Sequence, residues 1–238
     1  MSLTKPFNTR PLYQQVADEF VSRIVSRTWA PGQLIENEAE IARSLGISLG
    51  TVRKAFDILT ENKLLERHQG RGTVVVDFES EKMRSRFSNI SDKDGQRVSG
   101  EITHGAVEIV LPSADVAARL QVSEQTPVLA FERRRAHAGR LFMVEDVFLR
   151  VAPTAGPLSA AECERLARAR WSRQDIATYK IEKVGCALST EADRDAFGLQ
   201  ADTALLTLER VVYSYQSRAL ELRFARCHLG NDLSYSAD

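Results

Sequence analysis

Apolar residues recur at every fourth position near the start of the chain, between residues 12 and 27. This spacing is typical of the buried stripe of an amphipathic helix. Pro11 provides a preset φ where the helix begins, and the WAPG run at residues 29–32 ends it. The pattern predicts a helix of about four turns. Its stripe comprises Leu12, Val16, Phe20 and Ile24.

Two shorter helices are predicted next. Asn37 is a candidate N-cap for a helix over residues 37–45, with Glu40 in the capping-box position and Gly46 at its end. Ser48 is a candidate N-cap for the third helix. The residues expected on its inner side are Val52, Ala55, Phe56 and Leu59. The residues expected to face outward are Leu49, Gly50, Thr51, Arg53, Lys54 and Asp57.

Two strand-like runs, LLERH and TVVVDF, lie on either side of QGRG at residues 69–72. Glycine permits the positive φ that a tight hairpin requires. The three helices alone would suit a generic three-helix bundle. The short GIS turn between the second and third helices, together with the hairpin, is instead typical of a winged helix-turn-helix. We therefore expect this fold for residues 1–78.

The chain then becomes mostly polar and charged, which predicts a linker at residues 79–85. Residues 86–238 alternate strand-like and helical runs and are expected to form an antiparallel-sheet α+β domain. The expected elements are strands over 102–111 and 180–189, hairpins turning at Gly139 and Ser217, and helices capped by Ser113, Ser159 and Thr190. Residues 113–135 parallel residues 190–212, which indicates a duplicated strand-helix-hairpin unit.

Composition agrees with two soluble domains. The chain has 238 residues, of which 43% are hydrophobic and 27% charged. No apolar run approaches the roughly 18–20 residues of a membrane helix, and no signal-peptide core is present, so we expect a cytoplasmic protein with no membrane partner. Lys plus Arg and Asp plus Glu both number 32. Net charge therefore gives no argument for nucleic acid.

Candidate metal and redox chemistry is sparse. Cys163, Cys186 and Cys227 are odd in number and far apart, which argues against a disulfide framework or a C-x-x-C pair. We interpret all three as reduced, structural thiols. The four histidines are equally scattered and show no paired-ligand spacing. We expect neither a metal site nor a cofactor.

Residues 11–76 resemble the winged-helix domain of GntR-family bacterial transcription regulators. The resemblance rests on PLYQQVADEFVSRI, PGQLIENEAEIARSLGIS, TVRKAFDILTENKLL and QGRGTVV. Residues 86–238 resemble the UTRA effector-binding domain of the HutC-like branch, through RFSN, DGQRVSGE, MVEDVFL and the duplicated hairpins with FERRR and LER. The resemblance implies a DNA-binding regulator whose second domain has a chorismate-lyase-like fold and binds an effector.

The outward face of the third helix is then the candidate DNA-binding surface. A recognition helix enters the major groove by its N-terminal end, where Arg53 can bind one guanine through two hydrogen bonds and Ser48 and Thr51 can bind phosphate. The hairpin wing would approach the minor groove. The simpler alternatives are an Arg53–Asp57 ion pair on the helix surface and, for Arg71, a solvated turn. The candidate DNA-binding residues are Asn37, Glu38, Ser48, Leu49, Gly50, Thr51, Arg53, Lys54, Gln69, Gly70 and Arg71.

Two positions depart from the family pattern. Arginine is frequent where this chain has Leu49, and a polar or basic residue is frequent where it has Ala39. Each missing cationic contact is expected to weaken DNA binding by roughly 1–3 kcal/mol, although Leu49 can touch a thymine methyl instead. The operator sequence therefore stays open.

A second candidate site lies in the C-terminal domain. Arg133 and Arg135 are two apart on one expected strand and so share a face, and Glu145 lies on the next strand of that hairpin. One interpretation is a surface ion-pair ladder, which stabilises little. The other is a pocket in which both guanidinium groups hold an anionic ligand while Glu145 orients them, as the resemblance to UTRA domains implies. The resemblance adds Arg86, Ser88 and Glu221.

The expected function is that of a homodimeric transcription regulator, a repressor, whose small anionic effector alters its hold on double-stranded operator DNA. The effector would change the spacing of two winged helices over a palindromic site. Two alternatives stay open. One is a chorismate-lyase-like enzyme, against which we find no grouping of nucleophile, base and orienting residue. The other is a DNA-binding module that answers to a protein partner.

Overall fold

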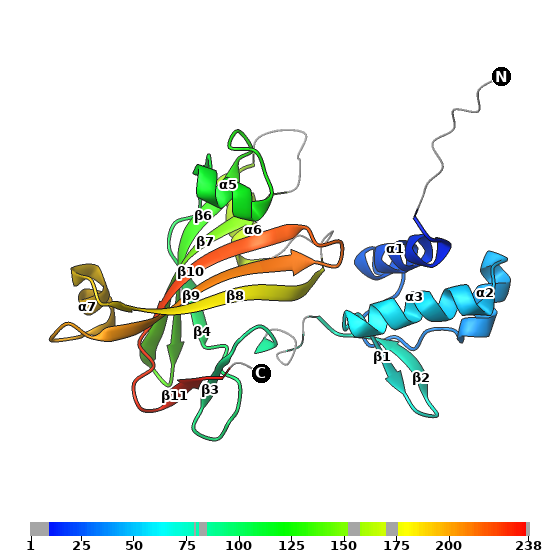
Figure 1. Ribbon diagram of the computed structural model, residues 1–238, viewed down its shortest axis with the longest axis horizontal. Helices are drawn as coiled ribbons and strands as arrows, with labels where there is room; N and C mark the ends of the chain where they lie inside the picture. Colours follow the sequence, from blue (N-terminus) through cyan, green and yellow to red (C-terminus); the bar gives the residue numbers. More distant parts are fainter. Residues whose placement is uncertain (1–9, 79, 81–84, 152–157, 170–175, 237–238) are drawn as a thin grey trace. The chain divides into compact units, whose positions relative to one another are not determined.

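A computed structural model describes residues 10–78, 80, 85–151, 158–169 and 176–236 (Figure 1). The chain divides into two compact units, unit 1 (residues 1–78) and unit 2 (residues 79–238). Of the linker predicted at residues 79–85, residues 79 and 81–84 lie outside the described part. Among the described residues, no helix is long and apolar enough to cross a membrane.

Unit 1 is a three-helix domain with an aromatic core. The helices are α1 (Leu12–Val25), α2 (Glu38–Leu45) and α3 (Leu49–Glu61). The Phe20 ring lies 5.0 Å from that of Trp29 and 5.5 Å from that of Phe56, and all three side chains are buried. The stripe predicted for α1 is wrong at Leu12, which is 52% exposed. Leu12 is the first residue of the helix, one turn before the first buried position at Val16.

Local side-chain caps fix where α2 and α3 begin. Asn37 accepts a hydrogen bond from the Glu40 backbone at 2.9 Å, and the Glu40 carboxylate accepts one from the Asn37 backbone at 3.3 Å, which completes the predicted capping box. Ser48 caps α3 by accepting from the Thr51 backbone at 3.1 Å. Gly46 ends α2 in the left-handed region at φ 65°. The turn between the two helices is therefore set by residues within a few positions of one another.

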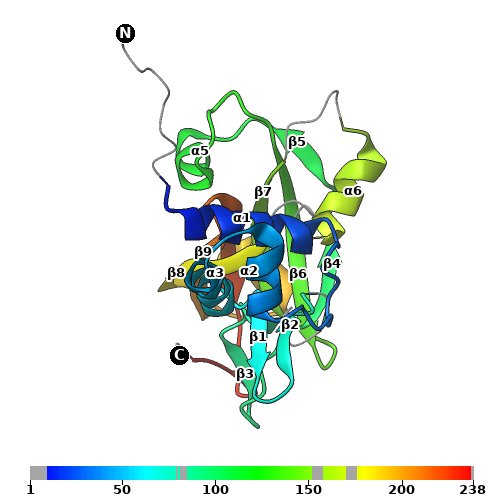
Figure 2. The same ribbon diagram turned by 90° about the vertical axis from the view of Figure 1, so that its right-hand side faces the viewer.

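The wing is the antiparallel hairpin of β1 (Leu65–His68) and β2 (Gly72–Val75), seen beside the helices in Figure 2. Gly70 and Gly72 have φ values of 73° and 100°, which L side chains rarely adopt. A Cβ atom on Gly72 would also lie 2.9 Å from Leu34 Cδ1. The predicted winged helix-turn-helix is thereby confirmed.

Unit 2 is built on one antiparallel sheet ordered β4-β6-β7-β10-β9-β8, with β5 also paired to β6. The strands are β4 (Glu101–His104), β5 (Glu108–Val110), β6 (Val128–His137), β7 (Arg140–Arg150), β8 (Ala177–Leu188), β9 (Ala204–Ser214) and β10 (Ala219–Cys227). A separate two-stranded ribbon joins β3 (Ile90–Asp92) to β11 (Leu233–Tyr235). The sequence pattern did not predict this ribbon, because strands of three residues are too short to show periodicity. The predicted α+β class is confirmed.

The sheet repeats one unit on either side of the β7–β10 contact. In the first half, β4 and β5, α5 (Ala114–Leu120), β6 and β7 follow one another; in the second, β8, α7 (Glu191–Phe197), β9 and β10 do. This order agrees with the predicted duplication. The single strand predicted over 102–111 is wrong, because it is split into β4 and β5. The pairing register shifts by one residue between His104–Arg133 and Glu108–Ala130, which is the effect of an inserted residue.

Helices cover both faces of the sheet, and α7 meets the same face as α5 further along β10, where Asp193 pairs with Arg226. Side chains alternate between the two faces along each strand. The helix α5 packs against one face, at Val128, Val211 and Leu222. The helix α6 (Ala160–Ala169) packs against one end of the opposite face, which includes Phe131 and Val147. The β3–β11 ribbon covers the other end of that face. The strip of this second face between α6 and the ribbon carries charged side chains.

Candidate DNA-binding and effector-binding sites

The start of α3 forms one side of the candidate DNA-binding site. Ser48, Gly50, Arg53 and Lys54 are exposed, whereas Leu49 and Thr51 are half-buried. The Ser48 and Thr51 hydroxyls lie 2.8 Å apart and can bond to each other. The Lys54 ammonium lies 5.4 Å from the centre of the Tyr13 ring on α1. The N-terminal turn of α3 therefore presents hydroxyl and cationic groups together, as phosphate binding requires.

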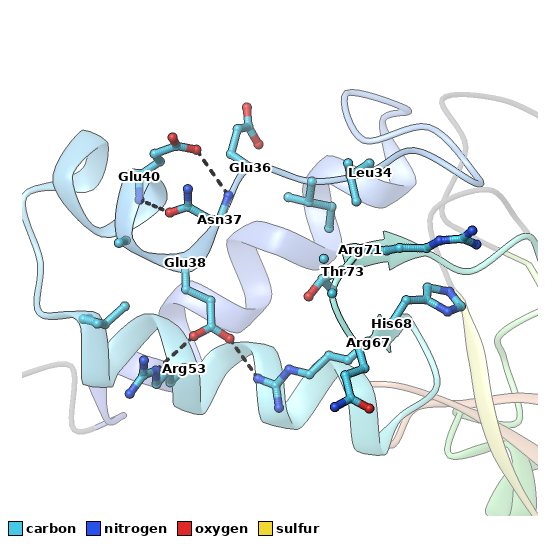
Figure 3. A pocket seen from close by; sticks show the side chains of 16 residues that line it. Leu34, Glu36, Asn37, Glu38, Glu40, Arg53, Arg67, His68, Arg71 and Thr73 are labelled. Atoms are coloured by element: carbon cyan, nitrogen blue, oxygen red, sulfur yellow. Dashed lines mark hydrogen bonds and ion pairs between the residues drawn. The ribbon is translucent and has the colours of Figure 1, made fainter.

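A groove of about 1060 Å³ separates α2 and the start of α3 from the wing (Figure 3). It is lined by Leu34, Ile35, Glu36, Asn37, Glu38, Ala39, Glu40, Leu49, Arg53, Arg67, His68, Gln69, Gly70, Arg71, Gly72 and Thr73. Arg71 projects from the wing in Figure 3, and Gln69, Gly70 and Arg71 are all exposed. The structure thus gathers predicted residues from α2, α3 and the wing around one groove. Asn37 uses its side-chain oxygen for the helix cap.

Glu38 joins two arginines across this groove. Its Oε2 accepts from Arg53 Nε at 3.0 Å, and its Oε1 accepts from Arg67 Nη2 at 3.0 Å (Figure 3). The alternative of an Arg53–Asp57 pair is wrong, because Asp57 instead accepts from Arg67 Nη1 at 2.7 Å. Sequence reasoning missed Arg67, since no local spacing connects residue 67 with residue 38.

The candidate effector residues of unit 2 meet through a carboxylate. Glu145 Oε2 accepts from Arg133 Nε at 2.6 Å and from Arg135 Nε at 2.8 Å. Arg133 also donates from Nη2 to Glu221 Oε1 at 3.1 Å. All four side chains are buried. The alternative of a surface ion-pair ladder is therefore wrong, because the face that carries these residues is covered at both ends.

These residues belong to a longer charged row across five strands. Arg223 on β10 pairs with Glu221 and lies 3.6 Å from Glu145, and it stands directly opposite Arg210 on β9. Arg210 pairs with Glu182 on β8. We call these eight residues together the charged row: Arg133, Arg135, Glu145, Glu221, Arg223, Arg210, Glu182 and Lys180. Sequence reasoning predicted the strands that carry Arg223, Arg210, Glu182 and Lys180 but did not assign these four residues to the site. The two-residue spacing of Lys180 from Glu182 and of Glu221 from Arg223 was the available signal.

The segment before β3 borders the charged row. Lys180 Nζ donates to the Phe87 carbonyl at 3.0 Å and to Glu182 Oε1 at 3.2 Å. The Ser88 hydroxyl donates to the Val98 carbonyl at 2.6 Å, and Arg86 donates to the carbonyl oxygen of Ala177. Arg86 thus lies at the β8 end, whereas Ser88 bonds to the residue before Ser99, whose carbonyl accepts from Arg135 Nη1 at 2.9 Å.

Burial and neighbouring charges shift the pKa values within the row. Burial would raise the pKa of Glu145, but Arg133, Arg135 and Arg223 hold it well below its usual value. Burial likewise opposes ionisation of Glu221, yet Arg223 and Arg133 lower its pKa to about 2. Burial lowers the pKa of Lys180 to about 8. The carboxylates are therefore charged at neutral pH, whereas Lys180 titrates only slightly above it.

Comparison with known proteins agrees with both halves of this architecture. Residues 12–75 match the gntR family of bacterial regulatory proteins, and residues 99–229 match the UTRA domain. The chain belongs to the GntR family, in its UTRA-domain branch. Since this family consists of regulatory proteins, the alternative of a chorismate-lyase-like enzyme is set aside.

Two proteins named as repressors are similar to this UTRA-domain chain. It is 29% identical over 150 residues to the mannosyl-D-glycerate transport/metabolism system repressor MngR of Escherichia coli (strain K12), covering 60% of each chain. It is 36% identical over 87 residues to the histidine utilization repressor of Pseudomonas aeruginosa, covering 37% of this chain and 35% of that one. The chain thus matches less than two thirds of either relative. The crystal structure of YydK from Bacillus subtilis subsp. subtilis str. 168 shares the fold, with a TM-score of 0.51, 13% identity, and coverage of 96% and 99% of the two chains.

Proposed function

We propose that this protein is a homodimeric transcriptional repressor that acts in the cytoplasm. Unit 1 binds operator DNA, and unit 2 binds a small anionic metabolite that lowers the affinity for the operator. The observation that carries this proposal is the match of one chain to both a gntR-type DNA-binding domain and a UTRA domain. The two units match separate families, which suits a division of labour between DNA and effector.

The groove of unit 1 supports a grip on two adjacent DNA grooves. Arg53 on α3 would read a guanine in the major groove, while Ser48 and Thr51 bind phosphate oxygens. Leu49, Gly50 and Lys54 would add contacts from α3, and Arg71 on the wing would reach the minor groove. The exposure of Arg53 and Arg71 supports these assignments.

The charged row of unit 2 supports an anionic effector. Its five cationic residues outnumber its three carboxylates, so the row carries excess positive charge when Lys180 is protonated. Excess buried charge is costly unless an opposite charge compensates for it. An anionic effector would supply that charge and compete with Glu145 and Glu221 for the guanidinium of Arg133. The effector would thereby exchange one set of ion pairs for another, with Arg86 and Ser88 at the margin of the site.

Carboxylate-bearing metabolites are the first candidates. The relatives are named as repressors of mannosyl-D-glycerate transport and metabolism and of histidine utilization. Glycerate and histidine both carry a carboxylate group. Two guanidinium groups are suited to hold such a planar anion through paired hydrogen bonds.

The edge of the unit 2 sheet supports dimerisation. The strand β8 ends the sheet, and no other described strand pairs with its outer side. Ile181, Val184 and Leu188 on this strand are 55%, 49% and 68% exposed. A long edge strand with exposed apolar side chains favours association. A second copy that pairs at β8 would give the two-fold symmetry that a palindromic operator requires.

A two-stage experiment tests the function. The full chain is used to select a duplex from a random-sequence pool, and fluorescence anisotropy then measures its affinity with and without mannosyl-D-glycerate, histidine or other carboxylates. We expect sequence-selective binding that at least one carboxylate weakens. Arg135→Met should abolish the response to that carboxylate. Arg134→Met is the matched control, because Arg134 is exposed and faces away from the row.

Two results would contradict the proposal. Absence of sequence-selective binding at every salt concentration would remove the DNA-binding function. An unchanged metabolite response in Arg135→Met would remove the effector site from the charged row and favour a module that answers to a protein partner.

A further inference from the structure

Three separate elements of unit 1 meet at one carboxylate. Glu38 begins α2, Arg53 lies in the second turn of α3, and Arg67 lies on β1. Each oxygen of Glu38 accepts from a different arginine, at 3.0 Å in both cases (Figure 3). We call this arrangement Arg53–Glu38–Arg67 the Glu38 bridge. Side chains from the helix-turn-helix and the wing are thus linked at the centre of the groove.

The Glu38 bridge leaves the end of Arg53 turned outward. Arg53 uses Nε for Glu38, and its side chain is 63% exposed. Within the described residues, its Nη1 and Nη2 atoms make no hydrogen bond. These are the two atoms that a bidentate contact with guanine O6 and N7 requires. A guanidinium held at Nε therefore has its reading edge oriented before DNA arrives.

The groove lacks the excess positive charge that holds DNA without regard to sequence. Its arginines are Arg53, Arg67 and Arg71, and its acidic residues are Glu36, Glu38 and Glu40. Non-specific DNA binding depends on release of counterions by cationic side chains. Glu38 reduces that attraction at the point where two of the three arginines meet. Any affinity gained in this groove must therefore come mainly from directed hydrogen bonds.

We propose that Glu38 is a specificity-determining residue of DNA recognition rather than a direct DNA contact. It holds Arg53 in the base-reading orientation and opposes attraction of the groove for phosphate. Specificity depends on the difference between operator and non-operator affinity. A residue that weakens binding to non-operator DNA therefore raises specificity. This inference rests on the proposed assignment of Arg53 to the operator.

Arg67 is the positioning residue of the same arrangement. It donates to Glu38 from Nη2 and to Asp57 from Nη1, at 3.0 and 2.7 Å. Both interactions neutralise its charge, so Arg67 acts through Glu38 and not as a phosphate ligand. Its position on β1 also connects the wing to the recognition helix α3.

The test compares Glu38→Gln with the wild-type full chain on two duplexes. One is the duplex that the wild-type chain selects from a random-sequence pool, and the other is its scrambled sequence; anisotropy is measured over a salt series. Glutamine keeps the size of the side chain but loses the charge and one strong acceptor. We expect tighter binding to the scrambled duplex, a log–log salt slope steeper by about 0.9, and an operator-to-scrambled affinity ratio lower by about tenfold.

Glu36→Gln is the matched control, because Glu36 lines the same groove and lies outside the Glu38 bridge. It makes the same change in charge but does not alter the orientation of Arg53, so the affinity ratio should stay closer to that of the wild type. An unchanged ratio in Glu38→Gln, or an equal loss in Glu36→Gln, would overturn the inference. Thermal melting checks that each variant is folded.

Two further variants separate this inference from the assignment of Arg53. If Arg53→Ala leaves operator affinity unchanged, the proposed DNA contact itself fails. If Arg53→Ala weakens operator binding while Glu38→Gln keeps the wild-type ratio, only the role of Glu38 fails. Arg67→Met should lower operator affinity without reducing the salt slope. A slope lower by about 0.9 would make Arg67 a phosphate ligand instead.

Discussion

Arg133 and Glu145 stand directly opposite each other on β6 and β7, and Arg133 Nε donates to Glu145 Oε2 at 2.6 Å. The side chains are 1% and 2% exposed. Glu145 is therefore a buried anion whose charge is compensated entirely by neighbouring side chains. Because Arg135 and Arg223 also lie beside it, its removal would affect several cations at once.

Glu145→Gln should destabilise unit 2 strongly. The substitution leaves Arg133, Arg135 and Arg223 with too little compensating charge, and loss of one partner of a buried ion pair costs about 3–5 kcal/mol. Urea unfolding, followed by a probe of unit 2, measures the change in the free energy of unfolding. Glu132→Gln is the control on the neighbouring strand β6, because its pair with Arg134 is solvent-exposed and is worth about 0–1 kcal/mol. Equal effects of the two substitutions would contradict the expectation.

Lys180 should make stability depend on pH above neutrality. Burial lowers its pKa to about 8 from the ordinary 10.5, with Arg210 acting in the same direction and Glu182 in the opposite one. Between these two values the unfolded chain binds more protons than the folded one, so the contribution of Lys180 to the free energy of unfolding rises with pH. Lys180→Met should remove this rise. Urea unfolding at pH values below and above about 8 measures this rise in the free energy of unfolding.

Lys183→Met provides the comparison for Lys180, because Lys183 lies on the same strand with a side chain that is 75% exposed. Other titrating groups, among them Tyr235 and Cys227, remain in both variants. A wild-type pH dependence in Lys180→Met would show that the environment of Lys180 in the folded chain differs little from water.

The hydroxyl of Ser48 should serve both folding and DNA binding. Ser48→Ala removes the hydrogen bond to the Thr51 backbone and should destabilise unit 1 by about 1 kcal/mol. Ser48→Asp keeps a capping acceptor, so stability should stay near the wild-type value, whereas its negative charge should repel phosphate. Thermal melting and anisotropy measure the two effects separately. Wild-type DNA affinity in Ser48→Asp would exclude Ser48 from the phosphate contacts.

The aromatic core should account for much of the stability of unit 1. Phe56 is fully buried against Phe20, and Phe56→Ala should cost about 3–5 kcal/mol through lost burial and a new cavity. Leu12→Ala should change stability by no more than about 0.5 kcal/mol, because Leu12 is 52% exposed. Chemical denaturation distinguishes the two. A large effect at Leu12 would indicate that another surface covers it.

One cysteine should react in the folded protein. Cys186 is exposed, whereas Cys163 and Cys227 are buried, and burial raises the pKa of Cys227 to about 12. A thiol reagent should therefore label only Cys186 in the folded single chain, label it more slowly when a second copy pairs at β8 as proposed, and label all three cysteines after unfolding. Peptide mass spectrometry identifies the labelled site. Rapid native labelling of Cys227 would show that the sheet opens there.

The helices of unit 1 could be predicted because their determinants are local. The Asn37–Glu40 capping box, the Ser48 cap and Gly46 act within a few residues of one another. Their patterns are legible without knowledge of the rest of the chain. The same holds for the hairpin turns in unit 2, where Ala138, Gly139 and Ser217 adopt positive φ. Leu12 was mispredicted because periodicity identifies a stripe but not how far its partner helix extends.

The surroundings of the candidate sites required the fold. Period two places Arg133, Arg135 and Glu145 on one face, but it does not state that α6 and the β3–β11 ribbon cover the two ends of that face. Arg210 and Arg223 join Arg133 only through the order of strands in the sheet. Cys163 lies between Glu162 and Glu164 yet is buried, whereas Cys186 lies between Gly185 and Ala187 yet is exposed.

The sequence by itself determined the winged helix-turn-helix, the α+β class of the second unit and most helix and hairpin boundaries, because short-range hydrogen bonds and apolar periodicity encode them. Only the tertiary structure decided that Glu38 binds both Arg53 and Arg67 and that the charged row is buried. These contacts join residues far apart in the chain. Their geometry depends on how strands and helices pack, which no local pattern specifies.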